Sequence, residues 1–70
     1  MSNKINIEYP ALIYKKNAFF VANCVMFNLS AIGRTEVQAI ENLQKSMNQA
    51  LSEYNISIIP IYESQYMKLI

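Results

Sequence analysis

The sequence predicts an α+β domain in the element order β-β-β-α-β, with one helix packed on a mixed sheet. Three observations lead to this prediction. Side chains alternate between two faces over residues 5–14, a run rich in aromatic and β-branched residues follows at 19–27, and apolar residues recur every three or four positions over 37–54. A period of two is typical of strands, and the longer period is typical of an amphipathic helix. The 70 residues contain no repeat and no linker-like segment, so we expect a single domain, 1–70.

The first two predicted strands form a hairpin. One face of the first strand is apolar and consists of Ile5, Ile7, Tyr9, Ala11 and Ile13. Pro10 lies on the other face and has no amide hydrogen, so we expect the strand to be unpaired on one side or irregular there. Asn17 can adopt a positive φ in the tight turn that leads to the second strand at 19–27. The two sides of that strand are expected to carry Phe20, Ala22, Cys24 and Met26, and Phe19, Val21 and Val25, respectively.

The second half of the chain contains the helix. A short third strand is expected over residues 28–33, and Thr35 is then the predicted N-cap, with Gln38 completing a capping box. The apolar stripe of the helix consists of Val37, Ile40, Leu43, Met47, Ala50, Leu51 and Tyr54. A fourth strand over 56–62 contains Pro60, which indicates an edge position in the sheet.

One face of this sheet is predicted to lack a cover. A single helix covers one face of a three- or four-stranded sheet, and the other face must meet water or another molecule. The residues available for that face are largely apolar, which marks an interaction site. The candidate interface residues are Leu12, Tyr14, Phe19, Val21 and Val25, together with Tyr66 in the C-terminal tail and one alternating set of residues 56–61.

The expected partner of that face is a second copy of the chain. A 70-residue domain has a marginal core of its own, so a homodimer or tetramer would add the missing burial. In the alternative, the strands curl or the tail folds back, and the face is buried within the monomer.

The composition argues against several classes of site. A formal net charge of +1 lacks the basic patch of a nucleic-acid-binding domain. One cysteine and no histidine exclude an intrachain disulfide and the usual zinc sites, and Cys24 has no histidine to activate it as a nucleophile. Glu8, Glu41 and Glu63 are interpreted as surface carboxylates rather than metal ligands. We therefore expect no catalytic residues, no cofactor and no metal. No apolar run is long enough to span a membrane, so we expect a cytosolic protein.

Three segments, "YPALIYKK" at 9–16, "FFVANC" at 19–24 and "GRTEVQAIENLQKSMNQAL" at 33–51, together resemble the HicB-like antitoxin family. The resemblance covers residues 9–54. It implies a partial ribonuclease H-like fold in which the last strand lies beside the first. It also implies a cytosolic dimer or tetramer that neutralises a small basic HicA-type toxin, an enzyme that degrades messenger RNA, by steric occlusion. The family's separate DNA-binding domain is not expected in this chain. The alternative is a stand-alone HicB-like homo-oligomer with a structural or ligand-binding accessory role and no toxin partner.

Overall fold

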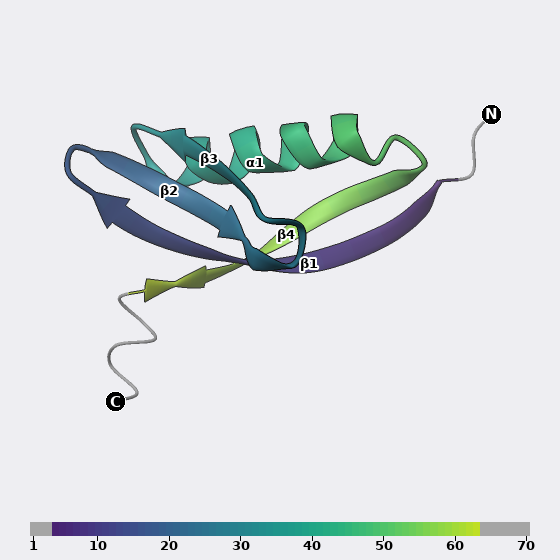
Figure 1. The fold of residues 1–70 in the computed structure, drawn as a ribbon, viewed down its shortest axis with the longest axis horizontal. Helices are drawn as coiled ribbons and strands as arrows, with labels where there is room; N and C mark the ends of the chain where they lie inside the picture. Colours follow the sequence, from purple (N-terminus) through teal and green to yellow (C-terminus); the bar gives the residue numbers. More distant parts are fainter. Residues whose placement is uncertain (1–3, 64–70) are drawn as a thin grey trace.

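The computed structural model describes residues 4–63 as one four-stranded sheet with a single α-helix on one face (Figure 1). This architecture confirms the predicted α+β class and the order β-β-β-α-β. The elements are β1 (Ile5–Lys16), β2 (Phe19–Cys24), a 3-10 turn (Val25–Phe27), β3 (Leu29–Gly33), α1 (Glu36–Ala50) and β4 (Tyr54–Tyr62).

The strands lie in the order β3-β2-β1-β4. β2 is antiparallel to both β1 and β3, whereas β4 is parallel to β1 along its whole length, because α1 carries the chain across the sheet. The last strand therefore lies beside the first, as the resemblance implies. β4 is an edge strand, which confirms the prediction made from Pro60. The pairing of β1 with β2 begins at Leu12, so Pro10 has a neighbouring strand on one side only, as expected.

The second strand is shorter than predicted. It ends at Cys24, and Val25–Phe27 form a 3-10 turn instead of continuing the strand to residue 27. Asn28 closes this turn with a φ of 53°, a left-handed conformation that asparagine tolerates better than most residues. The hairpin turn was predicted correctly, since Asn17 has a φ of 58° between the paired residues Lys16 and Phe19.

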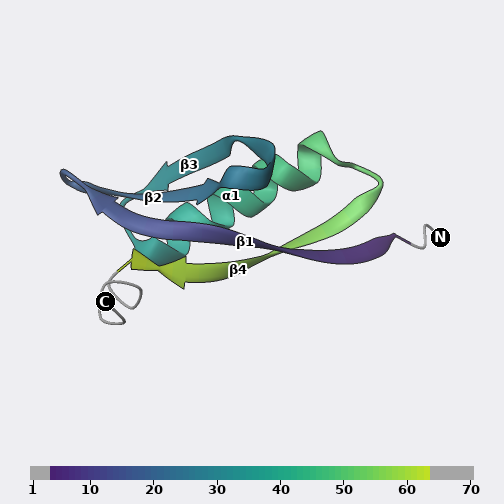
Figure 2. The ribbon, with the colours of Figure 1, turned by 60° about the horizontal axis from the view of Figure 1, so that its bottom comes forward.

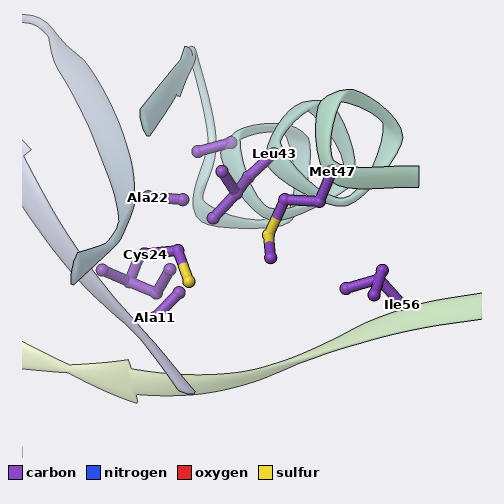
Figure 3. Packing of buried hydrophobic residues seen from close by; sticks show 8 residues of the cluster. Ala11, Ala22, Cys24, Leu43, Met47 and Ile56 are labelled. Carbon is purple, nitrogen blue, oxygen red and sulfur yellow. The ribbon is translucent and has the colours of Figure 1, made fainter. Parts of the chain in front are cut away.

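The core lies between α1 and the inner face of the sheet, which we define as the face that α1 covers (Figure 3). Its buried members are Ala11, Ile13, Ala22, Cys24, Ala39, Leu43, Met47 and Ile56. Two predictions about the helix stripe are wrong: Val37 is 62% exposed and Ala50 is exposed, while Ala39 is fully buried. The start of α1 lies so close to Gly33 that a Cβ there would come within 2.5 Å of the Ala39 nitrogen. Ala39, Leu43 and Met47 recur at a spacing of four and share the buried face of α1, whereas Val37 lies two positions before Ala39, about 200° around the helix, and so points away from the sheet.

The helix start follows the sequence prediction closely. The Thr35 hydroxyl oxygen accepts a hydrogen bond from the Gln38 backbone N–H at 3.0 Å. The Gln38 side-chain oxygen accepts in return from the Arg34 N–H at 2.6 Å, one residue earlier than in the usual capping box. The backbone N–H groups of Arg34 and Gln38, at the start of α1, therefore both have a hydrogen-bond acceptor.

Candidate functional site

The candidate site is the outer face of the sheet, on the side opposite α1 (Figures 1 and 2). Successive side chains of a strand point to opposite faces, so the residues that alternate with the core residues make up this outer face. Its central members are Pro10, Leu12, Tyr14, Phe19, Val21, Asn23, Ser30, Ile32, Ile59 and Ile61.

The strand registers bring the apolar members of the outer face together. Tyr14 pairs with Val21, and Val21 pairs with Ile32, so these three side chains form one row across three strands. Leu12 lies beside Ile61, and the next pair along β1 and β4 is formed by Pro10 and Ile59. At about 4.8 Å between strands and 3.3 Å per residue, the face from Pro10 to Lys16 covers roughly 300–350 Å², measured flat. This area also contains the polar residues Asn23, Ser30 and Lys16. The largest apolar patch on a monomeric protein is often functional, so the apolar part of this face is the candidate interaction surface.

Several of these side chains are strongly exposed. The exposed fraction is 58% for Ile32, 45% for Ile59, 44% for Phe19 and 43% for Ile61. Val21 is the exception, at 8%, because its neighbours in the row cover it. The center of the face is therefore packed, and its periphery presents apolar surface to solvent.

Four of the predicted interface residues, Leu12, Tyr14, Phe19 and Val21, are brought together on this face. Val25 is not on the strand: it lies in the 3-10 turn and is 75% exposed. Tyr66 lies outside the described residues.

Beside Leu12 the outer face contains a hollow of about 190 Å³. The residues around it include Pro10, Leu12, Asn23, Val25, Met26 and Ile61. Met26 was predicted to share a side with Cys24, but the turn exposes it to 67%. Val25 and Met26 thus extend the apolar surface past the end of β2.

Sequence reasoning missed Ile32 and left open which set of β4 residues belongs to this face. The structure assigns Ile59 and Ile61 to it, because Ile56 and Ile58 pack toward the core. The alternation of Ser30 and Ile32 was visible in the sequence, and it was the only available signal for Ile32.

Two charged side chains lie at opposite ends of the face. Among the outward-facing residues of the four described strands, Glu8 and Lys16 are the only charged ones, and both belong to β1. Each is four residues from Leu12, on the same side of the strand.

The free edge of β4 is occupied by side chains of α1. The Ile56 N–H donates to the Asn48 side-chain oxygen at 2.7 Å, and the Asn48 amide nitrogen donates to the Ile56 carbonyl at 3.2 Å. The Ile58 N–H donates to the Gln44 side-chain oxygen at 3.2 Å. Pro60, the next residue facing this edge, has no N–H. An added strand would find these donors already bonded, so this edge is closed to strand addition.

The opposite edge, formed by β3, is partly engaged in the same way. The Asn42 amide nitrogen donates to the Ile32 carbonyl at 2.9 Å. Amide side chains of one helix therefore contact both edges of the sheet. The outer face, by contrast, has no other element of the described chain packed on it (Figure 1).

Other kinds of site find little support within residues 4–63. No three His, Cys, Asp or Glu side chains in that range lie close enough together to hold a metal ion. Cys24 is fully buried in the core, so its thiol is not accessible to a substrate. An open hollow of about 300 Å³ lies near the hairpin end of the sheet, lined by Ile13, Tyr14, Lys15, Phe20, Glu36 and Glu63.

Over the part of the chain that the structure describes, no helix combines the length and apolar character needed to cross a membrane. Comparison of the chain with models of known protein families, with curated proteins and with solved structures finds no match. Membership of the HicB-like family, which the sequence resembles, therefore stays a prediction.

Proposed function

We propose that this chain is a non-enzymatic, oligomeric binding module of the HicB-like antitoxin kind. It would act in the cytosol as a homodimer or tetramer and neutralise a small basic toxin that degrades messenger RNA. The observation that carries this proposal is the apolar outer face, which lies between two sheet edges that α1 already engages. The position of β4 beside β1 also supports it, because the family resemblance implies that arrangement.

The energetics of the outer face favour a protein partner over water. Burying the exposed part of one isoleucine or phenylalanine releases roughly 1 kcal/mol, since complete burial is worth about 1.5–3 kcal/mol. Ile32, Ile59, Ile61 and Phe19 offer this gain together, along with the turn residue Val25. The sum is enough to offset a substantial part of the entropy lost on association.

Neutralisation would proceed by steric occlusion, which requires surface complementarity and no reacting group. When the outer face is used for self-association, the toxin must bind elsewhere on the module. The exposed carboxylates of Glu41, on α1, and Glu53, in the turn after α1, lie on other parts of the surface. Carboxylates there would attract a basic ribonuclease and speed its association.

The test is co-expression with the basic protein of about 60–90 residues that the family resemblance implies in the neighbouring reading frame. We expect the wild-type chain to restore growth and intact messenger RNA. Leu12→Asp places a charge at the middle of the outer face and should abolish this rescue while leaving the circular dichroism spectrum unchanged. Ser52→Asp adds the same charge at an exposed position after α1 and serves as the control.

Two results would count against the proposal. Absence of rescue by the wild-type chain would discard the antitoxin role. Full rescue by Leu12→Asp would show that the outer face is not needed for it.

The second candidate function is that of a stand-alone homo-oligomer with a structural or ligand-binding role. The observation that favours it is the hollow of about 300 Å³ near the hairpin end, which combines Lys15 with Glu36 and Glu63. An intact oligomer without any rescue of the toxin would select this alternative.

A further inference from the structure

The pattern of charges on the outer face indicates what covers it. We propose that the outer face binds the outer face of a second copy, with the two β1 strands antiparallel and crossing at Leu12. In this arrangement, Glu8 of each copy faces Lys16 of the partner subunit. The inference deepens the proposed function, on which it rests, by assigning the surface and the register of self-association.

The register follows from the spacing of the two charges. Glu8 and Lys16 each lie four residues from Leu12, which places each about 13 Å from it along the strand. A twofold axis through Leu12, perpendicular to antiparallel strands, brings each charge opposite the partner's opposite charge. Parallel strands would instead place like charges opposite each other. Like-charge contacts at an interface are costly, so the charge pattern selects the antiparallel arrangement.

The geometry of stacked sheets is compatible with these ion pairs. Two sheets that pack face to face lie about 10 Å apart and cross at about 30°. At about 13 Å from the crossing point, the two strands have then diverged sideways by about 7 Å. Glutamate and lysine have long, flexible side chains that together bridge such an offset, and both residues are exposed in the isolated chain.

The apolar middle of the face is complementary in the same register. Antiparallel crossing at Leu12 places Tyr14 of one copy over Pro10 of the partner subunit. Pro10 borders the hollow of about 190 Å³ whose walls include Val25 and Met26. The tyrosine ring can therefore enter this hollow, and twofold symmetry repeats the contact. Tyrosine suits the position because its ring is apolar while its hydroxyl stays near water.

The available area suits a dimer of modest affinity. A standard specific interface removes about 800 Å² from each partner, which is about 15% of the accessible surface of 5344 Å². The outer face from Pro10 to Lys16, at roughly 300–350 Å² measured flat, is smaller than that, and the exposed turn Val25–Phe27 beside it adds to the area. We therefore expect a dimer that dissociates on dilution within the micromolar range.

The experiment measures the mass of the full chain by light scattering over a dilution series. The variants are Glu8→Lys, Lys16→Glu and the double charge swap. Each single change replaces two attractive contacts per dimer with two like-charge contacts and should weaken dimerisation by about tenfold, as expected when two exposed charge pairs are lost together. The double swap restores both pairs and should return the dissociation constant to within about threefold of wild type.

Glu41→Lys and Lys45→Glu are the matched controls. They make the same net charge changes at exposed positions on α1, away from the outer face, and should leave the dissociation constant unchanged. The effect of the single changes at Glu8 and Lys16 should also shrink at high salt, as expected for exposed charges.

The outcomes separate this inference from the proposed function. A wild-type dimer that is insensitive to both single changes, or that the double swap does not restore, would overturn the antiparallel register but leave self-association standing. A wild-type chain that stays monomeric throughout the series would overturn both the register and the oligomeric module.

Discussion

The contact between Asn48 and β4 leads to a quantitative prediction about stability. The Asn48 amide exchanges two hydrogen bonds with the Ile56 backbone and donates a third to the Gln44 carbonyl at 2.9 Å. In this way a side chain takes the place that a neighbouring strand would occupy. Asn48→Leu keeps the branching of the side chain but removes all three hydrogen bonds.

The cost can be worked out from these bonds. Each hydrogen bond to Ile56 contributes about 1 kcal/mol, and a backbone group left without a partner costs about 1–3 kcal/mol. The higher helix propensity of leucine returns less than about 0.7 kcal/mol. We expect a net loss of about 2 kcal/mol in the free energy of unfolding. For a domain of this size, that corresponds to a fall in Tm of roughly 8–16 °C.

The assay is thermal and urea unfolding followed by circular dichroism. All variants must be compared at one protein concentration, because self-association raises apparent stability. Gln49→Leu is the control, since it makes a similar change at the adjacent, exposed helix position and should stay within about 0.5 kcal/mol of wild type. Hydrogen exchange of the Ile56 amide should also accelerate in Asn48→Leu and not in the control.

Equal stability of Asn48→Leu and Gln49→Leu would refute the reasoning. It would mean that water replaces the side-chain amide at the β4 edge without loss. An unchanged exchange rate at Ile56 would lead to the same conclusion by an independent measurement.

Three further predictions concern the helix and the strand before it. Gly33→Ala should destabilise by about 1–3 kcal/mol, because the added Cβ meets backbone atoms of α1 that cannot move independently. Thr35→Ala should lower the free energy of unfolding by about 1 kcal/mol, because the N-cap hydrogen bond is lost. Thr35→Ser keeps the hydroxyl group and should keep most of this stabilisation. Leu43→Ala should lower the free energy of unfolding by about 2–5 kcal/mol, because it leaves a cavity in the core. Val37 is exposed, so Val37→Ala should lower it by less than about 0.5 kcal/mol. Urea unfolding measures all of these, and similar losses for Leu43→Ala and Val37→Ala would contradict the assigned phase of α1.

Local signals in the sequence were sufficient to predict most of the fold. Alternation located β1, the positive φ of Asn17 located the hairpin, and Thr35 located the helix start. Pro60 indicated the edge strand because a missing N–H has the same consequence in any sheet. Each of these features depends on neighbours in the sequence, so each is visible without knowledge of the tertiary structure.

The errors arose where tertiary contacts decide between local alternatives. Val25–Phe27 are as apolar as a strand, and the left-handed Asn28 was the one sign that the chain turns there. The start of α1 was misjudged because hydrophobicity favours Val37, whereas Ala39 lies on the same face of the helix as Leu43 and Met47 and is buried with them.

The candidate site also combines residues that local sequence signals predict with residues that only tertiary contacts determine. Leu12, Tyr14, Phe19 and Val21 were predictable because they alternate with core residues on a hairpin. On β4, by contrast, both alternating sets contain isoleucines, and only the parallel register with β1 decides between them.

The polar residues of α1 link the stability of the fold to its mode of association. Asn42, Gln44 and Asn48 each form a hydrogen bond with a strand between eight and fourteen residues away in the chain. By bonding edge groups, they close the β4 edge and occupy one acceptor at the β3 edge, which reduces the sites at which a flat sheet would add strands. Association is then directed to the outer face, where the area is finite and two charges can set the register. A small domain with these features gains burial from a partner while avoiding open-ended aggregation, and this combination is what a binding module requires.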